Sequence, residues 1–238
     1  MAGLLLVHGS WHGAWCWDRI VPLLRDGGHD VRAIDLPAHG EDRSSPWRAT
    51  LASYGRCVSD AARDFAEPPI VVGHSMGGVA ITQAAAECPD VVGALVYLCA
   101  FVPARGESLV RLGMRDRSSR VFGSTVLAFG AVRVRPGRAR EVFYGTCSAA
   151  DAAWAEARLR PDPLRPLFHR LRNAVPANLA RAYIECTADR AISIERQRAM
   201  AMAASIGTVI SMETDHSPFL SAPHELAAHL SALATSLE

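Results

Sequence analysis

Ser75 is the residue whose surroundings most strongly indicate covalent chemistry. It is the middle residue of a Gly-His-Ser-Met-Gly pentapeptide at positions 73–77. The apolar run 69–72 precedes this pentapeptide, and residues 78–88 follow it with a helix-like composition that Pro89 ends. A serine on a sharp turn between a strand and a helix is held in a strained, exposed conformation that is typical of enzyme nucleophiles. The sequence therefore predicts a nucleophile at Ser75 rather than a plain glycine turn.

A serine nucleophile requires a base to take its proton. Two of the later histidines, His224 and His229, fall in a predicted terminal helix, and His169 falls in a region outside the predicted sheet. His216 instead comes directly after a late predicted strand. A side chain there lies at the sheet edge where Ser75 is expected, so we predict that His216 is the base.

The base in turn requires a carboxylate that fixes its tautomer. Asp189 follows the penultimate predicted strand and is expected at the same edge as His216. Asp215 is the sequence neighbour of His216, and neighbouring side chains in extended backbone rarely face each other. Asp151 and Asp162 lie outside the predicted sheet. We therefore predict Asp189 as the orienting acid.

Alternating strands and helices position these residues. Predicted strands lie at 4–7, 30–34, 69–72, 91–99, 182–187 and 207–212. Helical patterns lie at 18–25, 51–65, 78–88 and 194–204, and a last helix begins at Pro223. This alternation predicts an α/β fold with an open, mostly parallel sheet of about six strands flanked by helices.

The alternation is interrupted between residues 103 and 178, where no convincing buried strand is found. Helical patterns at 148–160 and 164–171 predict a mostly helical cap that covers the strand ends and excludes water. The predicted organisation is a first part of the core at 1–102, the cap at 103–178 and a second part of the core at 179–238. Arginine clusters in the cap favour a solvated face over an anion site.

Composition excludes several functional classes. The chain has 238 residues with a net charge of +1, which favours neither nucleic acid nor a membrane surface as partner. Its basic residues are all arginine, so a lysine Schiff base or a phosphate-loop lysine is impossible. Six scattered cysteines show no metal or redox spacing, and they predict a reducing, cytoplasmic setting with no metal and no cofactor. The apolar N-terminus has no basic leader and is interpreted as a strand. The sequence makes no prediction of the oligomeric state.

Five stretches carry a family resemblance: LLLVHGSWHGAWCWDRIVPLL, GHDVRAIDLPAHG, VVGHSMGG, YIECTADRAIS and TDHSPFLSAPHELA. They resemble the methylesterase and hydroxynitrile-lyase branch of the α/β-hydrolase superfamily, including its bacterial esterases. The cap segment FYGTCSAADAAWAEARLRPDPL is similar to bacterial cap segments. The resemblance implies the α/β-hydrolase fold, a Ser75–His216–Asp189 triad, and an oxyanion hole formed by the backbone N–H groups of Ser10 and Met76.

Three positions distinguish the two activities of this branch. Lyases of the group carry threonine at the position of Gly9, lysine at the position of Ser217 and usually glutamate at the position of His74. The lyase reaction needs a cation near the departing cyanide, and this chain has no lysine to supply it. Ester hydrolysis is therefore the predicted activity.

The expected substrate is a small-molecule ester with a hydrophobic or aromatic part, cleaved through an acyl-enzyme on Ser75. Trp11, His12, Met76, Phe219 and Trp154 are the candidates for the substrate pocket. Two alternatives stay open. The same fold could hydrolyse or cyclise a lactone, a thioester or a polyketide-like intermediate, or the protein could be a ligand-binding receptor with little turnover.

Overall fold

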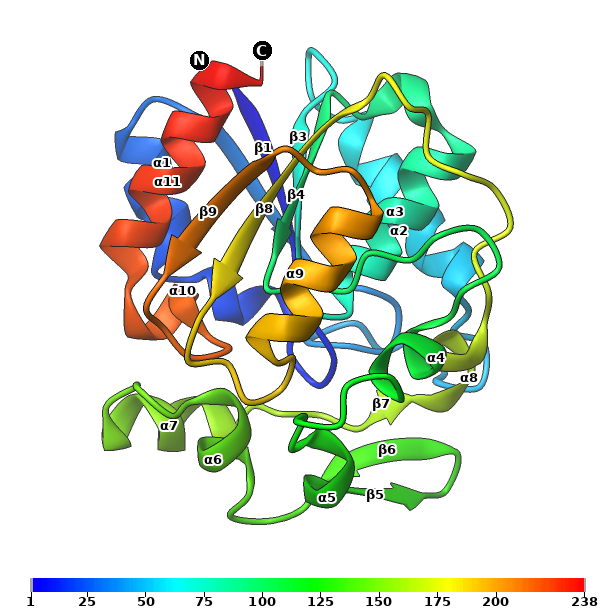
Figure 1. The fold of residues 1–238 in the computed structure, drawn as a ribbon, viewed down its shortest axis with the longest axis vertical. Helices are drawn as coiled ribbons and strands as arrows, with labels where there is room; N and C mark the ends of the chain where they lie inside the picture. Colours follow the sequence, from blue (N-terminus) through cyan, green and yellow to red (C-terminus); the bar gives the residue numbers. More distant parts are fainter. Residues whose placement is uncertain (1, 238) are drawn as a thin grey trace.

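The computed structural model describes residues 2–237, and its core is one sheet of six parallel strands in the order β2-β1-β3-β4-β8-β9 (Figure 1). The strands are β1 (Gly3–Val7), β2 (Asp30–Ile34), β3 (Ile70–His74), β4 (Ala94–Leu98), β8 (Ala180–Cys186) and β9 (Thr208–Met212). All six overlap the segments that the sequence predicts as strands. The central strands β3 and β4 are buried along their full length, as strands covered on both faces must be.

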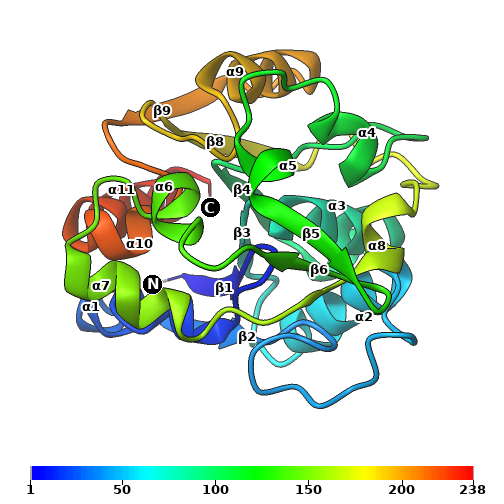
Figure 2. The same ribbon diagram turned by 90° about the horizontal axis from the view of Figure 1, so that it is seen from below.

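Helices cover both faces of the sheet, as predicted. The helices of the core are α1 (Ile20–Asp26), α2 (Leu51–Ala62), α3 (Gly77–Glu87), α9 (Ile194–Ala203), α10 (Pro218–Ser221) and α11 (Pro223–Ser236), with short 3₁₀ helices η1 (Ala14–Trp17) and η2 (Pro89–Val91). Helices α1 and α11 pack together on one face, and α2 and α3 pack together on the other with α9 beside them (Figures 1 and 2).

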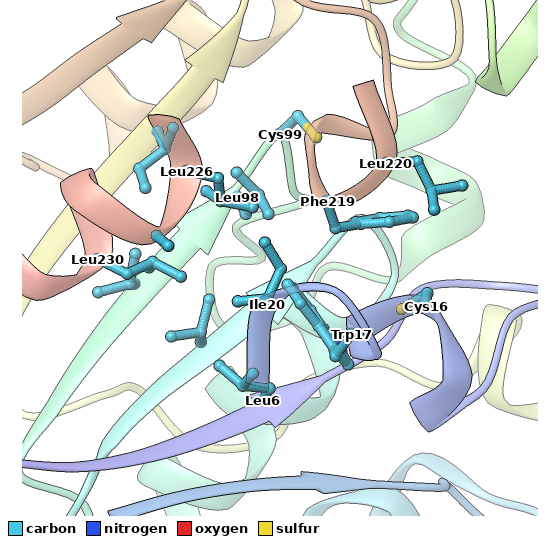
Figure 3. Close-up of a cluster of buried hydrophobic side chains, with 14 of the residues drawn as sticks. Leu6, Cys16, Trp17, Ile20, Leu98, Cys99, Phe219, Leu220, Leu226 and Leu230 are labelled. Atoms are coloured by element: carbon cyan, nitrogen blue, oxygen red, sulfur yellow. The ribbon is translucent and has the colours of Figure 1, made fainter. Parts of the chain in front are cut away.

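The alternation of side chains along each strand divides the core into two clusters. In β1, Leu4 and Leu6 belong to the cluster under α1 and α11, whereas Leu5 and Val7 belong to the cluster under α2 and α3. Figure 3 shows the first cluster, where Trp17 and Phe219 converge with side chains from β1, β4, α1 and α11. The loop after β1 and the loop after β9 are thereby packed against the same core.

The segment between β4 and β8 forms the cap, which lies across the carboxyl ends of the strands (Figures 1 and 2). Its helices are α4 (Leu109–Gly113), α5 (Val121–Ser124), α6 (Ala139–Phe143), α7 (Ala149–Glu156) and α8 (Leu164–Phe168). Its strands are β5 (Thr125–Ala128), β6 (Ala131–Val134) and β7 (Asp162–Pro163). The prediction of a mostly helical cap is confirmed, but the small antiparallel sheet was not predicted.

The unpredicted hairpin has a clear local cause. Phe129 and Gly130 link β5 to β6, and both have positive φ values of 49° and 75°. Two such residues form the tight turn whose twist matches a hairpin. The flanking strands are half-exposed, so a search for buried apolar runs misses them. Over residues 2–237, no helix combines the length and the apolar character needed to cross a membrane.

Candidate active site

Ser75 lies on the turn between β3 and α3, in the conformation that the pentapeptide predicts. Its φ is 54°, a left-handed value that strains a residue with a side chain. The turn is possible because glycines flank it. A Cβ on Gly73 would lie 2.8 Å from the carbonyl of Gly77, and a Cβ on Gly77 would lie 2.6 Å from the carbonyl oxygen of His8. Strand and helix therefore approach as closely as backbone allows.

The structure brings the three predicted side chains together at the carboxyl edge of the sheet. The Nε2 atom of His216 lies 2.9 Å from the Oγ atom of Ser75. The Nδ1 atom of the same ring lies 2.7 Å from the Oδ2 atom of Asp189. All three residues are buried, and they come from the loops after β3, β8 and β9. The serine hydroxyl thus faces an imidazole whose other nitrogen is held by a carboxylate.

Asp189 is fixed by donors on both of its oxygens. Oδ1 accepts from the backbone N–H groups of Ala191 at 2.6 Å and Ile192 at 3.0 Å. Oδ2 accepts from the side-chain amide of Gln197 at 3.2 Å, in addition to the imidazole. Gln197 is fully buried in α9 and also bonds both backbone polar groups of Cys186 at the end of β8. Sequence reasoning missed Gln197, because nothing in a helical pattern marks one glutamine as buried.

His74, the residue before Ser75, holds the backbone of His216. Its Nε2–H donates to the carbonyl of His216 at 2.8 Å, and its ring lies 4.6 Å from the ring of His216. Burial holds the pKa of His74 well below its ordinary value, and the nearby His216 acts in the same direction, so the ring is neutral. The sequence had singled out His74 only as a difference from lyases. Its positioning role depends on a contact across 142 residues.

His74 and His216 also form a cluster with Cys99 whose potential ligand atoms all lie within 4.8 Å of one another. Each ring nitrogen of His216 already has a protein partner in Ser75 or Asp189. The cluster is therefore explained by hydrogen bonding around His216, and we assign no metal to it.

The loop after β1 contains the first predicted oxyanion donor, Ser10. Its carbonyl accepts from Nδ1–H of His12 at 2.7 Å, and the Nε2 of His12 accepts from the hydroxyl of Tyr144 at 2.8 Å. The preceding carbonyl, of Gly9, accepts from Nδ1–H of His8 at 2.8 Å. Both carbonyls therefore have protein donors. The N–H of Ser10 has no protein acceptor within residues 2–237.

Met76 supplies the second predicted donor, from the start of α3. Within the same residues its N–H also has no protein acceptor, and Met76 directly follows Ser75.

Burial lowers the pKa of His12 from its ordinary 6.5 to about 4. Burial also holds the pKa of His8 well below its ordinary value, with nearby His39 acting in the same direction. Neutral rings match the one donated and one accepted hydrogen bond that each makes, since Nε2 of His8 accepts from the N–H of Leu36 at 3.0 Å.

A cavity of about 560 Å³ opens above Ser75 and His216, between the sheet edge and the cap. Ser10 and Trp11 of the loop after β1 lie in its wall, and most of the other wall residues are apolar side chains from the cap. The prediction is corrected for four pocket candidates that lie outside this wall. The side chains of Met76 and Phe219 belong to the core, His12 is buried, and Trp154 packs on Trp15 at a ring distance of 5.3 Å.

A larger groove of about 830 Å³ lies elsewhere, between α1, the loop after β2 and the residues that follow α7. None of Ser75, His216 and Asp189 belongs to its wall. Chemistry at a serine requires the reacting atom within reach of the hydroxyl. We therefore place the substrate in the smaller cavity.

Comparison with known proteins identifies the family of this chain. The sequence profile of the Alpha/beta hydrolase family matches residues 4–229. Esterase PIR7B of Oryza sativa subsp. japonica is 31% identical over 261 residues, which cover 98% of this chain and 96% of that protein. Methylesterase 2 of Arabidopsis thaliana is 31% identical over 253 residues, which cover 97% and 95%. A variant of tomato Methylketone Synthase I complexed with beta-ketoheptanoate superposes with a TM-score of 0.88 at 25% identity, covering 100% and 99%. The chain belongs to the alpha/beta hydrolase family.

Proposed function

We propose that this protein is a serine hydrolase that cleaves a small-molecule carboxylic ester through an acyl-enzyme on Ser75. The observation that carries the proposal is the pair of hydrogen bonds that joins Ser75 to His216 and His216 to Asp189. The esterase and methylesterase relatives support the same reaction, because each matches nearly the whole chain.

The first step follows from the geometry. Oγ of Ser75 attacks the ester carbonyl as Nε2 of His216 takes its proton. Asp189 accepts from Nδ1–H, which keeps Nε2 free to act as the base and stabilises the imidazolium that forms. The developing oxyanion is stabilised by the free N–H groups of Ser10 and Met76, and one such donor contributes about 3 kcal/mol.

The second step returns the proton and releases the acid. His216 gives its proton to the leaving alcohol, which departs and leaves the acyl group on Ser75. Water then attacks the acyl-enzyme as His216 takes its proton; the bond between the acyl carbon and Oγ of Ser75 breaks, His216 returns the proton to Oγ, and the carboxylic acid is released. The apolar wall of the cavity fits an ester with a hydrophobic or aromatic part.

The proposal is tested by replacing the nucleophile. Ser75→Ala should abolish turnover of p-nitrophenyl butyrate while the circular dichroism spectrum and melting temperature stay close to those of the unaltered protein. Ser45→Ala is the matched control, because Ser45 is exposed in the loop after β2 and outside the cavity. Turnover that persists in Ser75→Ala refutes the nucleophile. Organophosphate labelling followed by mass mapping should find the label on Ser75.

A panel of substrates distinguishes ester hydrolysis from reactions on other acyl compounds. Lactones, thioesters and polyketide-like intermediates pass through the same oxyanion, and the solved structure of Methylketone Synthase I contains a β-keto acid. Methyl esters, lactones and thioesters of matched acyl length should therefore be compared by kcat/KM. Preference for the methyl esters supports the proposal. Tight ligand binding with no turnover would favour a receptor instead.

A further inference from the structure

Asp162 is a fully buried carboxylate in the wall of the cavity that contains Ser75. It belongs to β7 of the cap, where it pairs with Val132 of β6. The sequence placed it in the cap and assigned it no function. Buried carboxylates are rare unless paired, so the partners of each of its oxygens must be accounted for.

One oxygen of Asp162 is taken by His39, from the loop after β2. The Nε2 atom of His39 lies 2.5 Å from Oδ1 of Asp162, and both side chains are fully buried. The Nδ1 atom lies 3.2 Å from the carbonyl oxygen of Pro37 and 3.5 Å from the hydroxyl of Tyr54. Because a carbonyl only accepts, the shorter contact indicates that Nδ1 carries a hydrogen.

The second oxygen of Asp162 has no partner. Within residues 2–237, no donor lies within hydrogen-bonding distance of Oδ2. One proton remains to be shared in the contact between Oδ1 and Nε2 of His39. If the imidazole holds it, Oδ2 belongs to a carboxylate; if Oδ1 holds it, Oδ2 is a carbonyl oxygen. In both cases Oδ2 is a buried acceptor without a donor.

The other acidic residue of the wall is different in this respect. Oδ2 of Asp116 accepts from the N–H of Ser193 at 2.7 Å, and its Oδ1 accepts from the N–H of Ser118 at 3.2 Å. Both oxygens of Asp116 therefore have a protein donor. Asp162 combines a place in the wall with a buried acceptor that has no protein donor, and such a group calls for a donor from outside the chain.

We propose that Oδ2 of Asp162 accepts a hydrogen bond from a hydroxyl or N–H group of the substrate. This inference rests on the proposed ester hydrolysis and narrows its substrate class to an ester that is mostly apolar but carries one donor away from the scissile carbonyl. Asp162 is a specificity residue in this scheme, because it touches the substrate and not the reacting atoms. A site with a buried acceptor rejects the analogue that lacks the donor, since the acceptor then stays unpaired.

The test compares esters that differ by one hydroxyl. Methyl phenylacetate and methyl 3-phenylpropanoate are assayed beside their 2-, 3- and 4-hydroxyphenyl counterparts, and the measured quantity is the ratio of kcat/KM for each hydroxylated ester to its parent. We expect at least one isomer to be favoured about tenfold or more, a difference of about 1.4 kcal/mol. A general loss of activity in a variant cancels from this ratio.

Three variants connect that ratio to Asp162. Asp162→Val removes the acceptor and should bring the ratio to about one, whereas Asp162→Asn keeps an acceptor oxygen and should retain part of the preference. If Asp162→Val does not fold, the double variant Asp162→Val with His39→Phe removes both polar partners together. Asp151→Asn is the control, because Asp151 is a carboxylate of the cap that pairs with Arg19 outside the cavity wall, and its ratio should equal that of the unaltered protein.

The outcomes separate this inference from the proposed function. Ester hydrolysis that depends on Ser75 but favours no hydroxyl isomer overturns the inference and leaves the proposed function intact. A preference that survives Asp162→Val also overturns it. Loss of the preference in Asp162→Val and in the double variant, but not in Asp151→Asn, supports it. If no ester is hydrolysed at all, both proposals fail together.

Discussion

Replacing Asp189 by asparagine tests the proposed mechanism most sharply, because the structure dictates how the new side chain must sit. An asparagine has one acceptor oxygen and one NH₂ group. On the Oδ1 side it meets the backbone N–H groups of Ala191 and Ile192, and two donors there would oppose an NH₂ group. The NH₂ group is therefore expected on the side of His216, which the imidazole and Gln197 now occupy as donors.

That orientation exchanges the tautomer of the base. An NH₂ group beside Nδ1 of His216 is paired only if Nδ1 accepts, so the ring hydrogen moves to Nε2. The Nε2 atom, 2.9 Å from the hydroxyl of Ser75, then carries a hydrogen and cannot take another proton as a neutral base. In serine hydrolases with this arrangement, the wrong tautomer lowers kcat by about 10⁴-fold, which corresponds to about 5.5 kcal/mol.

The assay measures kcat for p-nitrophenyl butyrate in Asp189→Asn, with circular dichroism and thermal melting to show that the fold is retained. Asp215→Asn is the matched control, since Asp215 is also buried but contacts Thr146, Ser217 and Ser221 and not the imidazole of His216. We expect kcat to fall less than about tenfold in the control. A similarly small loss in folded Asp189→Asn would refute the tautomer argument and the role of Asp189.

Two further predictions concern stability. Gly77→Ala places a Cβ 2.6 Å from the carbonyl oxygen of His8, and because backbone cannot yield there we expect a loss of about 1–3 kcal/mol, seen as a lower melting temperature; an unchanged melting temperature would contradict the close packing. His12 titrates near its ordinary pKa of 6.5 when unfolded but at about 4 when folded, so the unfolded chain binds more protons and stability falls as pH drops from about 6.5 to 4. Protonation of His12 should lower the free energy of unfolding by about 3 kcal/mol over this pH range. Urea unfolding at both pH values should therefore show a smaller loss of stability in His12→Gln than in the unaltered protein; equal losses would refute the role of His12.

The sheet was predictable because its signals are local. A strand buried on both faces is a continuous apolar run, and β3 and β4 are runs of this kind bounded by prolines or glycines. The hairpin of β5 and β6 has no such run, and only the turn at Phe129 and Gly130 marks it. Its strands are half-exposed, so they lack the continuous apolar run that marks the central strands of the core.

The site was predictable only in part, for a related reason. Ser75, Asp189 and His216 each follow a strand directly, and parallel strands end at a common edge, so topology alone places them near one another. Gln197 and His74 act through contacts with residues on other elements, and their sequence surroundings are those of ordinary helix and turn residues. The same holds for Asp162, whose partner His39 is 123 positions away.

The order of the chain separates the proposed chemistry from the choice of substrate. Ser75 precedes the cap, whereas Asp189 and His216 follow it, so all three belong to loops of the sheet. The wall of the cavity, including Asp162, comes largely from the cap. The cap also contacts these loops directly, through Tyr144 on His12 and Thr146 on Asp215, so only the wall residues that do not make such contacts can change without moving the strand ends that hold the triad. Substitutions in the cap wall should therefore alter relative kcat/KM between esters, whereas substitutions at the strand ends should lower kcat for every ester.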